Sequence, residues 1–423
     1  MNIELKSLIK EKELNGKSIC FLLGSGFSVP YGFETVGDIN KMFASLKIED
    51  IIISPARQVF FAKGEKDPNG WMNINERSFF VDFIEFYCSN LEGGSNFHYE
   101  DFYDFYHSRY RGEKNQVIDD FCKQYRAKYN MEESAANNVV NLLLSFDNIF
   151  TQLLASKLSR RALNENGVHY ANYPPYDQFL NYISYLINAG YIIHIFTLNH
   201  DILLDHMCAN SNLWESYSDG YDAQGSPFFG DLTIQDKVQG TGIPDITNVY
   251  KVRLKRFTDK FDNQIRIYKL HGSIDTHIIN VRGFDRPRVK NMFAVHDFYV
   301  EKEDDHGKLV YERSVGNNFP DYLSGTTEKL RSYSDSYYEV LFNHFKAELP
   351  NCVALGVIGY GFWDSGINNM LESGIFNNDI PVTVIDPYKP GGPLFKKYED
   401  AITHLKESLD NVHFDEFKVS IVS

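Results

Sequence analysis

Three side chains that could do chemistry together are the amide of Asn199, the carboxylate of Asp201 and the imidazole of His271. Each follows an apolar run, residues 193–196 for the first two and residues 265–270 for the third. Short continuous apolar runs are typical of buried strands in a parallel sheet. Ligands bind just outside the carboxyl ends of such strands. The sequence therefore predicts that these three groups lie at one edge of a sheet.

The three groups suit a reaction that develops positive charge. A carboxylate steadies such a charge, an amide positions a reactant or a water, and an imidazole with an unperturbed pKa near 6.5 serves as a base at neutral pH. A structural interpretation exists for each residue as well. Asn199 or Asp201 could be a helix N-cap, and His271 could be a hydrogen-bonded histidine of the core.

Glycine loops follow two further apolar runs. Gly24-Ser25-Gly26 comes after Ser18 to Leu23, and Gly359-Tyr360-Gly361 comes after Cys352 to Ile358. We expect a helical stretch from the first loop to about Leu46. Glycines let the backbone approach a phosphate, and a helix N-terminus offers N–H groups to it. A tight turn without a ligand explains the first loop equally well when it is taken alone.

A fifth apolar run, Pro381 to Ile385, ends in Asp386-Pro387. Five such runs separated by helical patterns predict an α/β protein with a Rossmann-like, doubly wound parallel sheet. Residues 51–189 differ, because aromatic and aliphatic residues recur there at helical spacing. We expect a large helical insertion over 51–189, with residues 1–50 and 190–423 forming one discontinuous nucleotide-binding domain.

Smaller features complete the expected organisation. The pair Glu100-Asp101 is interpreted as a solvated helix face or a first-turn charge. The aromatic residues of 79–110 are a first candidate for a subunit interface. The remaining segments are expected as follows: a helix at 3–14, loops over 210–262, a polar second insertion over 279–324, a helix opened by Thr326 or Thr327 and ending near Leu349, a last helix over 393–409, and a strand near 413–422.

Composition limits the classes of function. The 423 residues carry a formal charge of −15, which argues against a large nucleic-acid interface. Five dispersed cysteines without a Cys-x-x-Cys pair predict a reducing compartment and no structural metal. The charged start of the chain lacks the apolar region of a signal peptide, and no run of about 18 apolar residues predicts a membrane span. We expect a soluble, cytoplasmic protein.

The order of these motifs resembles the sirtuin-like family of NAD-binding proteins, and most closely its bacterial antiphage-defence branch. The resemblance covers about residues 17–45, 190–210, 264–275 and 325–390. The motifs are Gly-x-Gly-x-Ser-x-x-x-Gly (Gly24, Gly26, Ser28, Gly32), Thr-x-Asn-x-Asp (Thr197, Asn199, Asp201), Lys-Leu-His-Gly-Ser (Lys269 to Ser273), Gly-Tyr-Gly-Phe-x-Asp (Gly359 to Asp364) and Ile-Asp-Pro (Ile385 to Pro387).

The resemblance implies a role for each matching residue. Asn199 and Asp201 would lie beside the nicotinamide ribose of NAD, with His271 as the general base there. The residues implied in binding NAD are Gly24, Ser25 and Gly26 at the diphosphate, Ser28 and Thr197 in the same motifs, Gly359 and Tyr360 on the adenosine side, and Asp386 near the adenine ribose.

The sequence departs from the protein deacylases of this family. Their proline, phenylalanine and arginine after the glycine loop are missing from Gly32-Phe33-Glu34-Thr35-Val36-Gly37, and Leu198 replaces their usual glutamine. Their four-cysteine zinc module is missing too, since residues 274–351 contain no cysteine. Water is then the favoured acceptor.

The resemblance thus implies a NAD+ glycohydrolase that needs no metal and depletes NAD during phage infection. A non-catalytic sensor of NAD or ADP-ribose is the alternative, followed by a NAD-dependent protein deacylase. Control by homo-oligomerisation or by a partner such as a HerA-type ATPase is expected on the same basis.

Overall fold

A computed structural model gives the structure of the chain. The residues it describes are 17–53, 59–61, 74–91, 96–110, 112–134, 137–159, 174–211, 213–236, 246–280, 286–291, 295–314, 320–322 and 336–412.

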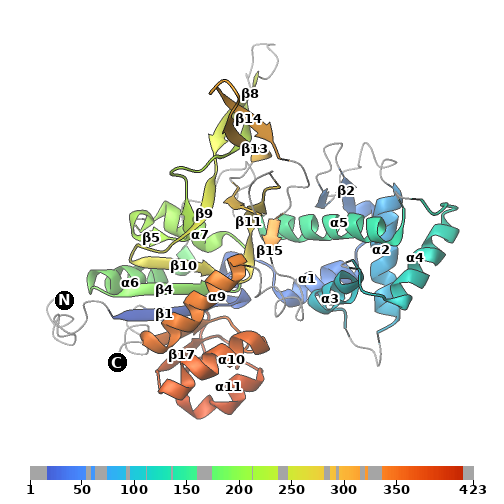
Figure 1. The fold of residues 1–423 in the computed structure, drawn as a ribbon. Coiled ribbons are helices and arrows are strands. Elements are labelled where there is room, and N and C mark those ends of the chain that lie inside the picture. The colour runs from blue at the N-terminus through green and yellow to red at the C-terminus, as the bar shows by residue number, and fades with distance from the viewer. Residues whose placement is uncertain are drawn as a thin grey trace, which may run out of the picture.

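A seven-stranded parallel sheet forms the centre of the molecule (Figure 1). In spatial order its strands are β18 (Ile402–Leu405), β17 (Val382–Ile385), β16 (Cys352–Ile358), β1 (Ser18–Leu23), β4 (Ile192–Thr197), β10 (Ile265–Lys269) and β5 (Tyr217–Ser218). All six pairings are parallel. The chain builds the sheet outward from β1 in both directions, which confirms the predicted doubly wound α/β architecture.

Helices cover both faces of this sheet. The side chains of β1 alternate between two cores: one face packs against α6 (Asp177–Asn188) and α7 (Leu203–Asn210). The other face packs against α9 (Ser336–Glu348) and α10 (Ser365–Gly374). Strands buried on two faces need apolar residues at every position, which explains their continuous apolar runs.

A separate helical part lies beside the sheet (Figure 1). Its elements are α1 (Val36–Ala44), α2 (Ile74–Ser89), α3 (Tyr99–Tyr110), α4 (Gln116–Lys128), α5 (Val139–Ser159) and the hairpin of β2 (Ile51–Ile53) with β3 (Val59–Phe61). Phe79, Phe80, Phe83 and Phe102 are at most 1% exposed. These aromatic side chains form the core of the helical part, so they are not available to a subunit interface.

The hydrophobic cores divide the chain near, but not at, the expected insertion boundaries. Ile39 and Phe43 of α1 already belong to the helical core, which extends to Leu158. Tyr176 and the apolar face of α6 belong instead to the core of the sheet. The domain limits of 51–189 therefore remain a proposal. The packing favours an end of the helical part before Tyr176.

The prediction that a helix starts directly after the first glycine loop is wrong. Two 3-10 turns, Ser25–Phe27 and Val29–Tyr31, come first, and Gly32 has a φ of 87°. The α-helix begins only after Thr35, whose hydroxyl and backbone N–H form a capping box with Asp38. Gly32, in the left-handed conformation, ends the second 3-10 turn, and the capping box at Thr35 begins the α-helix.

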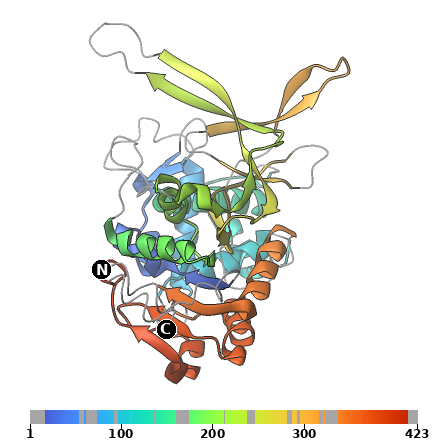
Figure 2. The same cartoon turned by 90° about the vertical axis from the view of Figure 1, so that its left-hand side faces the viewer.

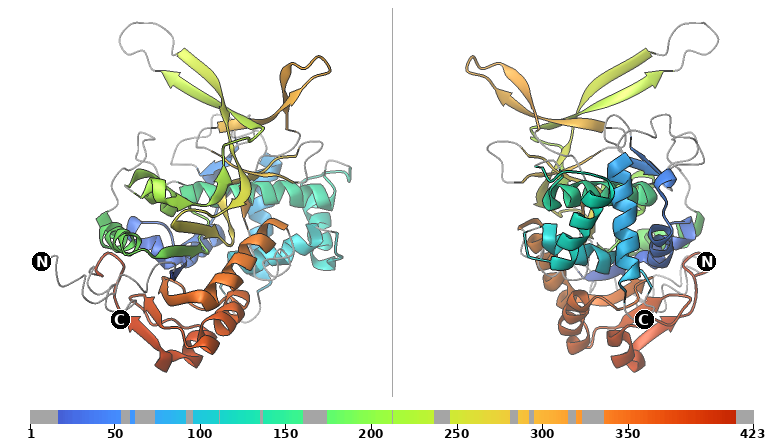
Figure 3. Two further views of the ribbon diagram at one scale, coloured as in Figure 1. Left: turned by 60° about the vertical axis from the view of Figure 1, so that its left-hand side comes forward. Right: turned by 90° about the vertical axis from the view of Figure 1, so that its right-hand side faces the viewer.

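Residues expected to be loops or a polar insertion form antiparallel sheets instead. The strands of the first sheet are β15 (Pro320–Tyr322), β11 (Gly272–Ile278), β12 (Arg288–Lys290), β9 (Lys255–Lys260) and β6 (Gly220–Asp222). Those of the second are β14 (Leu309–Arg313), β13 (Val295–Glu303), β7 (Phe228–Asp236) and β8 (Ile246–Arg253). In Figures 2 and 3 the second sheet extends away from the body as two diverging ribbons. Exposed ribbons lack a continuous apolar stripe, so apolar periodicity does not predict them.

The last expected helix is also shorter than predicted. α11 ends at Lys397 after starting at Pro393, and β18 follows because Ile402–Leu405 pairs with β17. The expected helix at 3–14, the caps Thr326 and Thr327, and the strand near 413–422 lie outside the described residues.

One helix among the described residues, Val139–Leu158 of α5, is long and apolar enough to cross a membrane. Leu143, Phe146, Phe150 and Leu153 of this helix are fully buried in the helical part. Its apolar character therefore belongs to a core helix.

Candidate functional site

The loops after β1, β4 and β16 meet at the carboxyl edge of the sheet, where the strand order reverses. A cavity of about 610 Å³ opens at this place. On the side of the sheet its lining residues are Gly24, Ser25, Ser28, Leu198, Asn199, His200, Asp201, His271, Gly359, Tyr360, Gly361, Trp363, Asp364 and Ser365. The predicted catalytic residues Asn199, Asp201 and His271 thus line one cavity.

Asn199 joins the β4 loop to the β1 loop. Its Nδ2 donates to the carbonyl oxygen of Gly24 over 2.9 Å and to Oγ of Ser28 over 3.1 Å. Its backbone N–H donates to Oγ1 of Thr197 over 3.1 Å. Thr197 is buried and is not among the residues lining the cavity. It therefore orients Asn199 from behind.

Asp201 is held by two donors in a buried place. Ser28 donates from Oγ to Oδ2 over 2.7 Å, and the N–H of Leu203 donates to Oδ1 over 3.0 Å. The second bond closes an Asx turn just before α7, whose N-cap is Ile202, so Asp201 is not itself the helix N-cap. Burial raises the pKa of Asp201, while the charge of Lys269 and the bond from Ser28 act to lower it.

His271 comes from the end of β10 and faces a carboxylate of the β16 loop. Its Nε2 lies 3.6 Å from Oδ2 of Asp364, and only 4% of the His271 side chain is exposed. The other carboxylate oxygen of Asp364 caps α10 by accepting the N–H of Ile367 over 3.0 Å. Asp364 can therefore orient the imidazole toward the cavity.

The glycines of the two loops make a close backbone contact. A Cβ on Gly24 would lie 2.5 Å from the carbonyl oxygen of Gly359, and a Cβ on Gly26 would lie 2.7 Å from Cα of Gly359. Gly359 itself has a φ of 64°. Only glycine fits at these three positions, and the β1 and β16 loops can meet because of it.

The backbone of the first glycine loop is already engaged. The N–H groups of Gly24 and Gly26 donate to the carbonyls of Ile358 and Gly359, and that of Ser28 donates to Ser25. In this conformation the N–H groups of Gly24, Gly26 and Ser28 have backbone acceptors and do not point to a free phosphate cradle. A role of Gly24, Ser25 and Gly26 at a diphosphate stays a prediction.

Two other predicted residues differ in their relation to the cavity. Tyr360 lines it and donates from its hydroxyl to Oδ1 of Asn368 over 3.1 Å. Asp386 follows β17 and accepts the N–H of Tyr388 over 2.9 Å, but it is not among the lining residues. The role of Asp386 near an adenine ribose is therefore untested.

The helical part supplies a wall that the sequence did not reveal. Its lining residues, together with the segment that follows the 3-10 turns, are Phe33, Glu34, Val36, Ile39, His98, Tyr99, Glu100, Asp101, Leu154 and Leu158. Glu100 and Asp101 do lie in the first turn of α3, as expected. Their place in the cavity depends on how α3 packs, and no local pattern encodes that.

No protein-family model and no curated protein matches the chain. Among solved structures, a mutant Sir2 homologue in complex with ADP ribose is similar, with 9% identity and a TM-score of 0.38, over 99% of this chain and 96% of that one. A Sir2 homologue in complex with NAD gives 8% identity and a TM-score of 0.32, over 99% and 94%. Likeness of this size establishes no relationship, so the site rests on its own geometry.

Proposed function

We propose that the chain is a sirtuin-like enzyme that binds NAD+ in this cavity and hydrolyses it to nicotinamide and ADP-ribose. The proposal depends chiefly on one observation: Asn199, Asp201 and His271, which come from two strands, line one cavity at the switch point of a doubly wound sheet. Nucleotides bind at such points in doubly wound sheets.

The residues suit the bond that would break. Cleavage between C1′ of the ribose and the ring nitrogen leaves a cationic sugar carbon and neutral nicotinamide. The buried carboxylate of Asp201 would stabilise that cation, since charges interact strongly where water is excluded. Asn199 would position the ribose or the water. His271 would take the proton as water attacks C1′, and such assistance typically contributes about 10²–10⁴-fold.

Hydrolysis is preferred to deacylation on the basis of the cleft. The cavity wall opposite the sheet is made by the helical part, with Tyr99, Glu100 and Leu158 among its residues. The deacylases that the sequence resembles instead form an acyl-lysine cleft with a zinc module. A wall of this kind favours a small acceptor such as water.

The biological role follows from the resemblance alone. We propose that the protein acts in the bacterial cytoplasm. There its hydrolysis of NAD+ would deplete the NAD of the cell and so halt phage infection. Uncontrolled hydrolysis would harm the cell, so control by homo-oligomerisation or by a partner such as a HerA-type ATPase is part of the proposal.

The test is to incubate the purified protein with NAD+ and to quantify nicotinamide and ADP-ribose by chromatography. Asn199→Ala and His271→Ala should both lose turnover, whereas His344→Ala, at a surface pair with Asp259, should keep it. Equal turnover in all variants would refute the site. Binding of NAD+ without turnover, alone or with a candidate partner, would favour the sensor, and release of deacylated peptide from an acyl-lysine substrate would favour the deacylase.

A further inference from the structure

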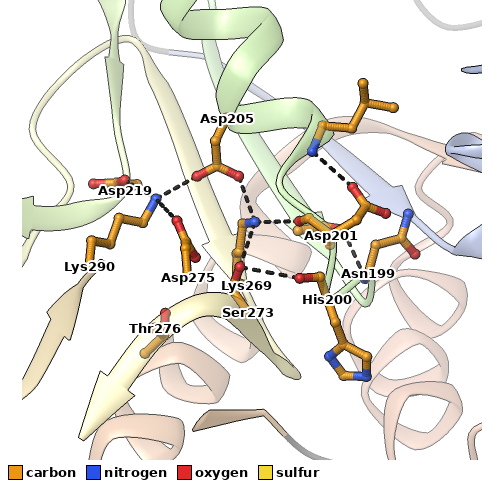
Figure 4. Close-up of polar contacts among 12 residues, drawn as sticks. Asn199, His200, Asp201, Asp205, Asp219, Lys269, Ser273, Asp275, Thr276 and Lys290 are labelled. Atoms are coloured by element: carbon orange, nitrogen blue, oxygen red, sulfur yellow. Dashed lines mark hydrogen bonds and ion pairs between the residues drawn. The ribbon is translucent and has the colours of Figure 1, made fainter. Parts of the chain in front are cut away.

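A buried lysine connects the two strand ends that carry the proposed catalytic residues. Lys269 ends β10, two residues before His271, and is 7% exposed. Its Nζ donates to the carbonyl oxygen of Asp201 over 2.7 Å and to Oγ of Ser273 over 3.0 Å. The same nitrogen lies 2.6 Å from Oδ2 of Asp205 in α7 (Figure 4).

A second lysine shares the carboxylate of Asp205 but lies farther from the cavity. Lys290 of β12 contacts Asp205, Asp219 and Asp275 (Figure 4). Burial alone would lower the pKa of Lys290, and these three carboxylates raise it well above its usual value. For Asp205, burial raises the pKa, but Lys269 and Lys290 together outweigh it and lower the pKa below its usual range. The carboxylate of Asp205 is therefore ionised and the ammonium group of Lys290 is protonated.

Such a cluster is not needed for packing. Removing charges from water costs several kcal/mol per ion, and apolar residues of similar size are often as stabilising as a buried pair. Lys269 differs from Lys290 in one respect: it donates to the main chain of the Asn199–Asp201 loop. The carbonyl of His200 in that loop also accepts a bond from Ser273, over 3.3 Å.

We propose that Lys269 is a positioning residue for the proposed reaction: it fixes the Asn199–Asp201 loop relative to His271 and keeps a positive charge beside the carboxylate of Asp201. The first part concerns geometry and is independent of the reaction. The second part rests on the proposed function, because it requires an ionised Asp201 during turnover.

Several charged or titratable groups act on Asp201. They are Lys269 from β10, Asp205 from α7 and Tyr176 from the turn before α6. The other titratable residues that line the same cavity are Glu34, His98, Tyr99, Glu100, Asp101, His200, His271, Tyr360 and Asp364. Lys269 lowers the pKa of Asp201 and Asp205 raises it, whereas the ion pairs of Lys290 are with Asp205, Asp219 and Asp275. The two lysines therefore form a matched pair for experiment.

The first experiment is hydrogen exchange on the full chain, without any ligand. In Lys269→Met, the amides of Leu198–Asp205 should exchange about 10-fold faster or more than in wild type, because the loop has lost its anchor. In Lys290→Met, which removes a charge whose side chain is 13% exposed against 7% for Lys269, these amides should keep their protection relative to the rest of the sheet. Equal deprotection of the loop in both variants would overturn the geometric part.

The second experiment is the pH profile of kcat/KM for NAD+. Its acid limb contains one step for His271 and one for Asp201, because both must be without a proton. Lys269→Met should move the Asp201 step to higher pH, and Lys269→Arg, which retains the cation, should return it toward wild type. Lys290→Met should leave the limb in place. An unmoved limb in an active Lys269→Met variant would overturn the electrostatic part. Absence of turnover in wild type, both alone and with a candidate partner, would refute the proposed function instead and leave the exchange result valid.

A variant that removes a negative charge instead of a positive one provides a test if Lys269→Met does not fold. Asp205→Asn leaves the lysine in place and removes a negative charge near Asp201. Its acid limb should therefore move to lower pH, opposite to that of Lys269→Met. A shift to higher pH in Asp205→Asn would contradict the proposed balance of charges.

Discussion

Ser28 donates a hydrogen bond from its Oγ to Oδ2 of Asp201 over 2.7 Å, although the two residues are 173 positions apart. Both side chains are buried, at 2% and 7% exposure. The same hydroxyl accepts from Asn199. One serine therefore connects the β1 loop to both polar groups of the β4 loop, and this explains how two separate motifs form a single site.

Removing the Ser28 hydroxyl should reduce stability in a pH-dependent way. Ser28→Ala leaves a buried carboxylate oxygen without this donor, at a cost of about 1–3 kcal/mol, and raises the pKa of Asp201 further above its unfolded value. A raised acid pKa costs stability only where the carboxyl is ionised in the unfolded chain. Denaturant titrations should therefore show the full loss at pH 7 and a smaller loss near pH 4. Ser25→Ala, at an exposed position of the same loop, is the control, and a loss that does not depend on pH would contradict the assignment.

Adding a methyl group to Gly359 should separate the two glycine loops. Gly225 and Gly359 have nearly equal φ values, 66° and 64°, but a Cβ meets nothing within 4 Å at Gly225 and lies 2.4 Å from the backbone of Gly26 at Gly359. Gly225→Ala should cost about 1–2 kcal/mol from conformation alone. Gly359→Ala should cost at least ~2 kcal/mol more, because backbone must move. Equal midpoints in urea would show that the loops do not touch.

The parallel sheet was predictable because each of its long strands is a continuous apolar run, as in Cys352–Ile358. The ribbons of the second antiparallel sheet were not, since the apolar residues of β14 (Leu309, Val310 and Tyr311) are exposed and do not alternate with polar ones. The interrupted helix after the first glycine loop could have been predicted from Pro30, Gly32 and the Thr35–Asp38 capping pair.

The residues of the candidate site likewise divide into those that the sequence predicted and those that it did not. Asn199, Asp201 and His271 were found because they follow strands, and strand ends share one edge of a parallel sheet. Glu100 and Leu158 were missed because they reach the cavity only through the packing of α3 and α5 against the sheet. The engagement of the loop N–H groups by Ile358 and Gly359 was likewise hidden, since it depends on contact between β1 and β16.

A buried histidine should make the fold sensitive to acid. His194 is 1% exposed, and burial, with Arg266 and His344, lowers its pKa to about 3, although Glu348 lies 3.5 Å from Nε2. The unfolded chain binds a proton near pH 6.5 that the folded chain does not bind. Stability contributed by neutral His194 is therefore lost as the pH falls from about 6.5 to about 3, and about 2 kcal/mol is lost by pH 5.

The check compares unfolding free energies at pH 7 and pH 5. His194→Asn keeps a polar partner for the Tyr268 hydroxyl, which lies 3.3 Å from Nδ1, and should reduce the drop between the two pH values by about 2 kcal/mol. His306→Asn, at an exposed histidine, should leave the drop unchanged. An undiminished drop in His194→Asn would assign the acid sensitivity to other groups.

The carboxylate of Asp364 should contribute to turnover separately from its role as a helix cap. Oδ1 caps α10 and Oδ2 faces Nε2 of His271 at 3.6 Å. Asparagine is as good an N-cap as aspartate, so Asp364→Asn should retain the stability of the fold and lose only the charge beside the imidazole. We expect kcat for NAD+ to fall about 10-fold, equivalent to about 1.4 kcal/mol of transition-state stabilisation. Asp364→Ala should show the same fall and in addition lose about 0.5–2 kcal/mol of unfolding free energy. Unchanged kcat in a folded Asp364→Asn variant would mean that the carboxylate only caps the helix, and the orientation of His271 would then depend on its own strand end.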